Sequence, residues 1–285
     1  VWKDRQGRTT PLPLEPRPYL MPALSPDGRR VADTLADGLA RNIWIGSVDG
    51  GAMMRLTPGD DDVFSLFSRD GRWVYYTSNQ DDEYNIYHIR SDGSAPPERV
   101  TESPSAQRAT SSSPGDRVFL LNQTASGAAE SGNMDIFGLE GGKTFSIVAT
   151  PFTEFRAVFS PDGRYIAYTS NDSGRLEVYI QAFPSGSRSK VSRDGGQCPI
   201  WNPRGGELLF QGPDAVMAAR VVDGVPVAPP VRLFAHHSDP PDWGVAPDGE
   251  RFLVVEASAG SKSPPQINVV VNWLDELKAK LPAPR

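Results

Sequence analysis

One four-residue turn recurs six times along the chain at an almost constant interval. Its fullest form is Ser-Pro-Asp-Gly, in which proline presets φ near -65°, aspartate caps the turn and glycine accepts a positive φ. The six copies begin at Ser25, Ser68, Ser113, Ser160, Asn202 and Ala246. The intervals are 42 to 47 residues, so six similar units occupy most of the 285 residues. A period of about 44 residues matches one four-stranded propeller blade.

The segments that follow these turns are apolar at both odd and even positions. They are Arg72–Thr77, Arg164–Thr169, Glu207–Phe210 and Arg251–Val255. A strand that is apolar on both alternating faces is buried on both sides, as in a sheet packed between two other sheets. A single β-sandwich would more often leave one face polar.

A second strand with an aromatic residue follows about 19 residues after most turns. These strands contain Ile43–Ile45, Ile86–Tyr87, Ile136–Phe137 and Val178–Tyr179, the third of them late in its unit. A glycine-containing turn and a last strand such as Met54–Thr57 complete the unit. Four strands joined by hairpins therefore make each unit, labelled a to d in chain order. The sequence predicts an all-β fold, a six-bladed β-propeller of four-stranded antiparallel blades, as a single domain over residues 1–285.

The two ends of the chain supply the parts of an incomplete blade. Val1–Arg5 and Thr9–Leu12 stand where strands c and d would precede the first turn, and Trp243–Glu256 supplies a sixth pair of strands a and b. We therefore expect segments 1–13 and 243–272 to close the ring, which would remove exposed sheet edges. Ile267–Asn272 is a surplus strand expected in the same blade, and a short C-terminal helix is expected over Asn272–Leu281.

The repeated Ser-Pro-Asp-Gly turn followed by an aromatic or β-branched strand resembles the TolB-like β-propeller repeat, a relative of the WD repeat. Three segments resemble more closely the C-terminal propeller of certain bacterial membrane Ser/Thr kinases: Val1–Gly7, Thr150–Arg164 and Ile267–Trp273. That resemblance implies a periplasmic or otherwise extracytoplasmic module. The third unit departs from the repeat, because Gly115 and Asp116 are swapped and the loop Gln123–Met134 is longer.

Composition argues against several classes of partner. The net charge is -6 and the pI about 5.2, whereas nucleic-acid and anionic-membrane surfaces need clustered Lys and Arg. Cys198 is the single cysteine of the sequence, so an internal disulfide is excluded. No apolar run approaches the roughly 18 residues of a membrane-spanning helix, and no signal peptide is visible in this chain. We expect a monomer that binds no nucleic acid and does not insert into a membrane.

The sequence lacks the motifs of the common catalytic sites. It has no H-R-D or D-F-G of a kinase, and Gly141–Thr144 lacks the first glycine of a phosphate-binding loop. It also has no G-x-S-x-G and no H-E-x-x-H. We expect no catalytic residue, no metal and no cofactor, although clustered carboxylates or the adjacent His236 and His237 leave a metal site open as an alternative.

Function in a propeller concentrates where the loops from strand d to the next strand a converge on the central channel. The candidate binding residues in these loops form a mixed-charge ring with one tryptophan, a combination that suits a protein or peptide partner. They are Asp60, Asp61, Asp62, Glu102, Arg108, Glu154, Arg156, Arg193, Asp194, His236, His237 and Trp243. The alternative is an ordinary solvated channel mouth.

Three functions follow from this pattern. The leading one is a non-catalytic binding, scaffold or sensor propeller, either the extracytoplasmic module of a kinase or a stand-alone TolB-like protein. The second is a metal-dependent hydrolase or lactonase of propeller type. The third is the accessory propeller of a prolyl-oligopeptidase-like peptidase.

Overall fold

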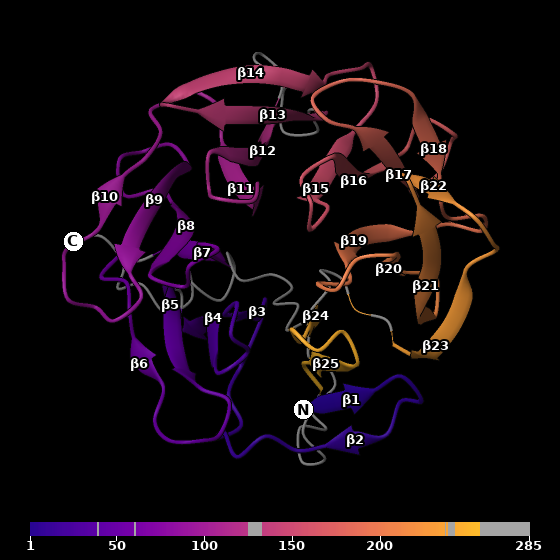
Figure 1. The fold of residues 1–285 in the computed structure, drawn as a ribbon. Coiled ribbons are helices and arrows are strands. Elements are labelled where there is room, and N and C mark those ends of the chain that lie inside the picture. The colour runs from indigo at the N-terminus through magenta and orange to yellow at the C-terminus, as the bar shows by residue number, and fades with distance from the viewer. Residues whose placement is uncertain (39, 60, 125–132, 237, 239–242, 257–285) are drawn as a thin grey trace, which may run out of the picture. The chain divides into compact units, whose positions relative to one another are not determined.

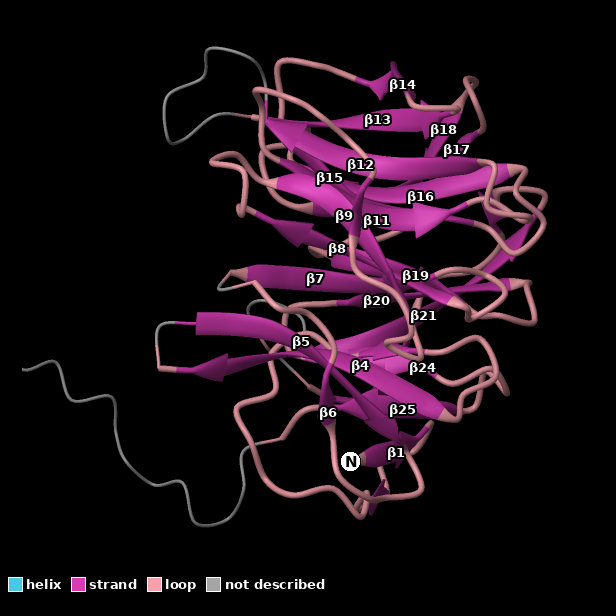
Figure 2. Cartoon of the chain, turned by 90° about the vertical axis from the view of Figure 1, so that its left-hand side faces the viewer, coloured by secondary structure: helices cyan, strands magenta, loops and turns pink. Residues whose placement is uncertain are grey.

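The computed structural model describes residues 1–256 except 39, 60, 125–132, 237 and 239–242. Residues Val1–Val255 form one unit. Within the described residues the regular structure is entirely β, as Figure 2 shows. The C-terminal helix and the Ile267–Asn272 strand expected from the sequence lie outside the described residues.

Six antiparallel sheets are arranged in a ring, as predicted (Figure 1). Blade 1 contains β3 (Ala23–Leu24), β4 (Arg30–Asp37), β5 (Ala40–Ser47) and β6 (Met54–Arg55). Blade 2 contains β7 (Asp62–Phe67), β8 (Trp73–Ser78), β9 (Asn85–Arg90) and β10 (Glu98–Arg99). Blade 3 contains β11 (Gln107–Ser112), β12 (Val118–Thr124), β13 (Met134–Glu140) and β14 (Lys143–Val148). Blade 4 contains β15 (Glu154–Phe159), β16 (Tyr165–Ser170), β17 (Glu177–Ala182) and β18 (Arg188–Lys190). Blade 5 contains β19 (Gln197–Trp201), β20 (Glu207–Gln211), β21 (Ala215–Val222), β22 (Val225–Pro226) and β23 (Val231–Ala235). Blade 6 contains β24 (Trp243–Val245) and β25 (Arg251–Val254) together with β1 (Trp2–Asp4) and β2 (Thr9–Thr10).

Blade 5 departs from the expected four strands. Its third strand, β21, is eight residues long and pairs with two outer strands. β23 pairs with Ala215–Ala218 and β22 with Val221–Val222. The long β21 therefore offers more edge than one short outer strand covers.

The recurring turn joins strand a to strand b in each blade, and its hydrogen bonds explain its composition. In the first copy the Ser25 hydroxyl donates to the Asp27 carboxylate at 2.5 Å and accepts from the Arg30 N–H at 2.9 Å. In the fourth copy the Ser160 hydroxyl donates to Asp162 at 2.6 Å and accepts from the Tyr165 N–H at 3.0 Å. The repeated serine and aspartate therefore hold the turn closed.

The glycine of the turn has a second role, because neighbouring turns pack on each other. Gly28 has a φ of +70°, and a Cβ at this position would lie 2.8 Å from Cδ of Pro247 in the preceding turn. Gly163 meets Pro114 of its neighbour at the same distance of 2.8 Å. At these two places the turns of adjacent blades interlock through a glycine of one and a proline of the other.

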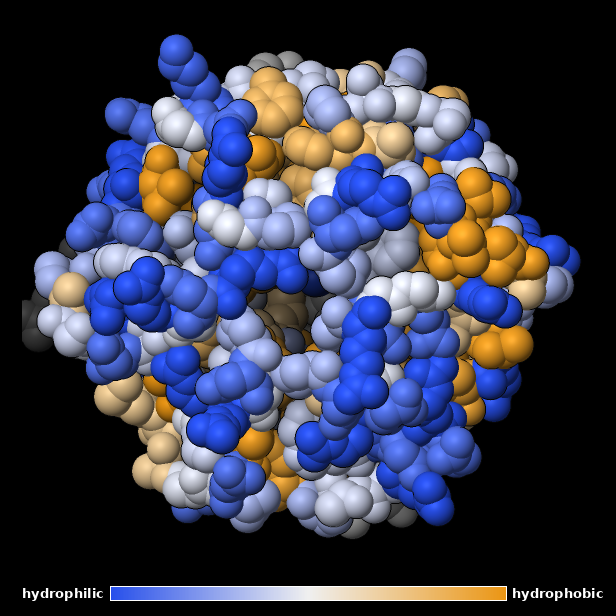
Figure 3. Space-filling view, viewed as in Figure 1, coloured by the Kyte–Doolittle hydropathy of each residue, from blue (hydrophilic) through white to orange (hydrophobic). Residues whose placement is uncertain are grey.

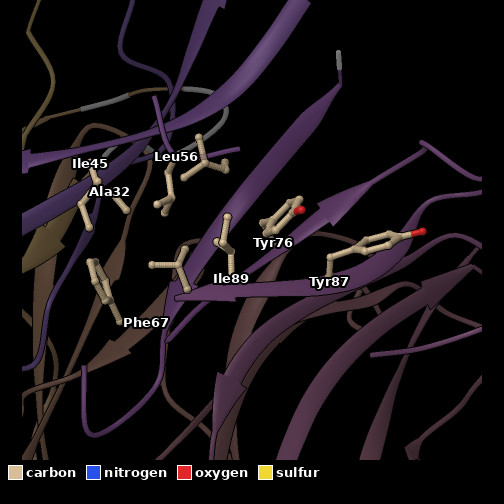
Figure 4. Packing of buried hydrophobic residues seen from close by; sticks show 9 residues of the cluster. Ala32, Ile45, Leu56, Phe67, Tyr76, Tyr87 and Ile89 are labelled. Atoms are coloured by element: carbon tan, nitrogen blue, oxygen red, sulfur yellow. The ribbon is translucent and has the colours of Figure 1, made fainter. Parts of the chain in front are cut away.

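Each pair of adjacent blades encloses its own hydrophobic core. Between blades 1 and 2, Ala32 and Ile45 pack with Tyr76 and Tyr87, as Figure 4 shows. Tyr75, on the opposite face of β8, packs against Phe119 of blade 3, with ring centroids 4.5 Å apart and the ring planes tilted by 46°. The prediction that strand b is buried on both faces is confirmed, and these interfaces hold the ring together.

The N-terminal strands complete blade 6. β1 lies between β2 and β25 in blade 6, with Trp2 opposite Leu253 and Lys3 opposite Phe252. Arg5 reaches from this segment to blade 5, where its guanidinium lies 2.5 Å from the Glu207 carboxylate. Strands from both ends of the described chain therefore complete the sixth blade.

Candidate functional site

A central cavity of about 460 Å³ is lined by the first strand of all six blades, and the face in Figure 3 is hollowed near its middle. These strands, β3, β7, β11, β15, β19 and β24, lie nearest the centre of the ring in Figure 1. Prolines of the recurring turns line the end of the cavity where the strands finish; they are Pro26, Pro161, Pro203 and Pro247. Side chains from the beginning of the strands line the other end, which we call the loop mouth.

Several inner strands contain one extra residue near the loop mouth. In β7 the register with β8 shifts between Val63 and Leu66, and a corresponding shift occurs in β15 between Phe155 and Val158. Such a β-bulge reverses the alternation of side chains along the strand. Two residues an even number of positions apart would normally point to the same face of the sheet, but they point to opposite faces when the bulge lies between them.

At the bulge, residues other than glycine adopt a left-handed backbone conformation that glycine favours. Phe64 has a φ of 59°, Arg156 of 56° and Cys198 of 52°, and each stands four residues before its turn. The left-handed conformation costs a non-glycine residue about 1–2 kcal/mol. All three residues line the cavity. Strain of this kind persists where the surrounding structure enforces it, and it often marks a functional position.

Two arginines flank the ring of Phe64 at the loop mouth. The guanidinium carbon of Arg108, from β11, lies 4.3 Å from the ring centroid, and that of Arg156 lies 5.7 Å from it. Burial, and then repulsion by the charge of Arg156, lower the pKa of Arg108. Among the described residues no carboxylate lies within ion-pair distance of either guanidinium. Two positive charges thus share one aromatic ring without a described counter-charge.

A neighbouring arginine is neutralised, in contrast. Arg41 donates from Nε to the Asp61 carboxylate at 2.6 Å, and the Tyr84 hydroxyl donates to the other carboxylate oxygen. Burial opposes ionisation of Asp61, but these hydrogen bonds lower its pKa overall. Asp61 is therefore ion-paired within the protein, whereas Arg108 and Arg156 contact Phe64 and have no described carboxylate partner.

Two of the predicted acidic residues are buried away from the cavity. Asp62 and Glu154 are the first residues of β7 and β15, and both are fully buried. One oxygen of Glu154 accepts hydrogen bonds from the hydroxyls of Thr150 and Ser170. Neither carboxylate oxygen of Asp62 has a hydrogen-bond partner in the described structure. Neither residue is among those that line the cavity.

The remaining predicted residues are spread around the ring. Trp243, on β24, is 5% exposed and lines the cavity. Glu102, Arg193 and Asp194 are exposed in loops, and Arg193 borders a separate surface hollow with residues 225–229. The ring of His236 lies 3.3 Å from the Ser238 hydroxyl. Asp60 and His237 lie outside the described residues. Of the predicted ring, the structure therefore brings Arg108, Arg156 and Trp243 to the cavity.

The sequence interpretation did not single out Phe64, Arg41 or Tyr84. One signal was available for Phe64, because it stands at the same distance before its turn as Arg156 does. The pairing of Arg41 with Asp61 joins residues 20 positions apart and has no local signature.

The described residues show neither a grouped set of metal ligands nor a membrane-spanning helix. No three His, Cys, Asp or Glu side chains among them are grouped so as to hold a metal ion. None of their elements is a helix long and apolar enough to cross a membrane.

Comparisons with curated proteins give partial matches, and no family model matches the chain. An uncharacterized protein of Agrobacterium fabrum is 28% identical over 171 residues, which cover 57% of this chain and 58% of that protein. The Tol-Pal system protein TolB of Methylococcus capsulatus is 32% identical over 76 residues, or 27% of this chain and 18% of that protein. The chain therefore matches less than two thirds of the length of either relative.

Solved structures show the same architecture. A putative TolB from Agrobacterium tumefaciens superposes with a TM-score of 0.67 at 17% identity, covering 85% of this chain and 92% of that one. The chain has a TolB-like propeller fold. TolB from Acinetobacter baumannii has a TM-score of 0.57 at 18% identity, over 83% of this chain and 54% of that one. An oligogalacturonate lyase in complex with manganese has a TM-score of 0.56 at 11% identity, over 85% of this chain and 90% of that one. The TolB-like fold thus occurs in proteins of different activity, and the function must be argued from the site.

Proposed function

We propose that this chain is a non-catalytic binding module that takes a segment of a protein or peptide partner into the loop mouth of its central cavity. The observation that carries the proposal is the cavity of about 460 Å³, which combines aromatic and apolar walls with a few polar groups. Concave sites of this composition are the usual places for recognition. Phe64, Ile200 and Trp243 supply apolar surface, and Asn122 and the two arginines supply hydrogen-bonding groups.

The strained backbone supports a role in recognition. Phe64 and Arg156 are held in the left-handed region by the bulge, so their side chains are positioned before any partner arrives. Preorganised side chains lose less conformational entropy on binding, which favours affinity. The likeness to the Tol-Pal system protein TolB supports a protein partner and an extracytoplasmic location.

The proposal also concerns the larger protein in which the module acts. We infer that the chain serves as the extracytoplasmic module of a membrane Ser/Thr kinase or as a stand-alone TolB-like protein, acting as a monomer. The flanking genomic sequence tests this point. A kinase domain and a membrane helix upstream would assign the module to a kinase, and an α/β-hydrolase domain downstream would instead indicate a peptidase.

A peptide-display selection on the chain of 285 residues tests the binding function. We expect an enriched peptide family that binds the wild-type chain and loses affinity for Phe64→Ala. The matched control is Val231→Ala, because Val231 is 59% exposed on the outer strand β23, away from the cavity. Thermal unfolding of both variants establishes that they are folded. The absence of any enriched peptide, or equal binding to Phe64→Ala, would overturn the proposal.

A further inference from the structure

We propose that the loop mouth recognises a carboxylate of its partner, held by Arg108 and Arg156, whose guanidinium groups both lie against Phe64. This inference rests on the proposed function and specifies the chemistry of the bound segment as an acidic peptide. The constellation draws its three side chains from three consecutive blades, on β7, β11 and β15. A ligand at this point would touch the inner strands of all three.

The unbalanced charge is the first argument. The chain carries a net charge of -6, yet these two guanidinium groups have no described carboxylate within ion-pair distance. Arg41, on β5 of blade 1, has Asp61 at 2.6 Å. Burial, and then repulsion from Arg156, lower the pKa of Arg108, so an anion that contacts both guanidinium groups would stabilise both charges.

The geometry of Arg108 is the second argument. Its guanidinium carbon lies 4.3 Å from the centroid of Phe64, which is the range of a cation–π contact. The ring limits where the guanidinium can go and shields one side of it from water. Protein atoms crowd the guanidinium enough to lower its pKa, but Arg108 as a residue remains exposed to solvent, so a ligand can reach it. Arginine binds carboxylates through two parallel hydrogen bonds, which favours a planar acceptor.

The backbone of Arg156 is held in place by hydrogen bonds, which is the third argument. Arg156 stands at the bulge position with a φ of 56°, the equivalent of Phe64 in blade 2. Its N–H donates to the Asn122 side chain at 2.9 Å, and Asn122 also donates to the Glu154 carbonyl at 3.3 Å. The backbone beneath the guanidinium is therefore fixed by partners that do not neutralise its charge.

Short peptides at 0.15 M salt test the inference, with fluorescence anisotropy as the readout. The probes are blocked hexaglutamate, blocked hexaserine, hexaserine with a free C-terminal carboxylate and blocked hexaphosphoserine. We expect hexaglutamate to bind, and Arg108→Gln and Arg156→Gln each to weaken it by roughly tenfold, the effect of losing one charged hydrogen-bonding partner. Binding of free-ended but not blocked hexaserine would show that the C-terminal carboxylate is also recognised.

The matched control is Arg220→Gln, which removes the same charge from an exposed position on β21. Equal weakening by Arg220→Gln would show unspecific attraction and overturn the inference. Binding of hexaphosphoserine without hexaglutamate would overturn the assignment to a carboxylate. Displayed peptides that depend on Phe64 but not on either arginine would refute the inference while the proposed function stands. If no peptide depends on Phe64, both fail.

Discussion

The interlocking of neighbouring turns makes a quantitative prediction at Gly28. This residue combines a φ of +70° with a neighbour, Pro247 Cδ, 2.8 Å from where a Cβ would lie. Gly205 occupies the same place in the turn of blade 5 with a φ of +79°, and it has no heavy atom within 4 Å of its Cβ position. The two glycines therefore share the backbone strain but differ in the contact.

Gly205→Ala is expected to lower the free energy of unfolding by about 1–2 kcal/mol, the cost of a left-handed alanine. Gly28→Ala is expected to lower it by about 1–3 kcal/mol more, the usual cost of overpacking. For a domain of this size each kcal/mol corresponds to about 2–4 °C in Tm. Urea unfolding followed by circular dichroism measures both variants under identical conditions.

A double-mutant cycle isolates the contact between the turns. Pro247→Ala removes the atom that a Cβ at Gly28 would approach, so the double variant should recover most of the extra loss. Equal destabilisation by Gly28→Ala and Gly205→Ala would refute the reasoning, because the packing between turns would then contribute nothing measurable.

Three other predictions follow from the described contacts. Deleting residues 1–13 removes the strand that pairs with β25. Size-exclusion chromatography should then show aggregation, or calorimetry should show a large fall in Tm. A truncated protein that stays monomeric with an unchanged Tm would contradict the pairing of the N-terminal segment with blade 6. Hydrogen bonds lower the pKa of Asp70 and Asp162 from 3.8 to about 2, so these carboxylates stabilise the folded state above pH 4 and that contribution is lost toward pH 2. Acid unfolding monitored by circular dichroism should accordingly be less steep in Asp70→Asn, and an unchanged profile would argue against it. Asp62→Asn should raise Tm, because a buried amide costs less free energy than a buried carboxylate without hydrogen-bond partners. Glu154→Gln should lower Tm, because the Glu154 carboxylate accepts a hydrogen bond from Thr150. The opposite order of the two Tm values would contradict the assigned hydrogen bonds.

Much of the fold could be predicted because its signals are local and repeated. The turn at Ser25 and its five counterparts require particular residues for short-range reasons: a serine hydroxyl, a capping carboxylate and a glycine with positive φ. Their period determines the number of blades. That the N-terminal segment joins the last blade could also be predicted, because it filled the strand positions missing from the last unit, whereas the register of Trp2 opposite Leu253 comes from the structure.

The candidate site was predictable only in part. The loops that surround the cavity follow from the order of strands, and Arg108, Arg156 and Trp243 do line it. Asp62 and Glu154 are fully buried and do not line the cavity, and Asp61 is neutralised by Arg41. A list of loop residues could not separate these groups, because burial and pairing depend on neighbours distant in sequence.

The sequence by itself determined the repeating unit, the six blades and the closure of the ring, since each depends on short-range turn chemistry or on counting strands. Only the tertiary structure decided which side chains face the cavity. The physical reason is the bulge in strands such as β7 and β15, where one extra residue reverses the alternation of faces. That residue turns Phe64 and Arg156 into the cavity at the cost of backbone strain, and the packed ring of blades maintains it.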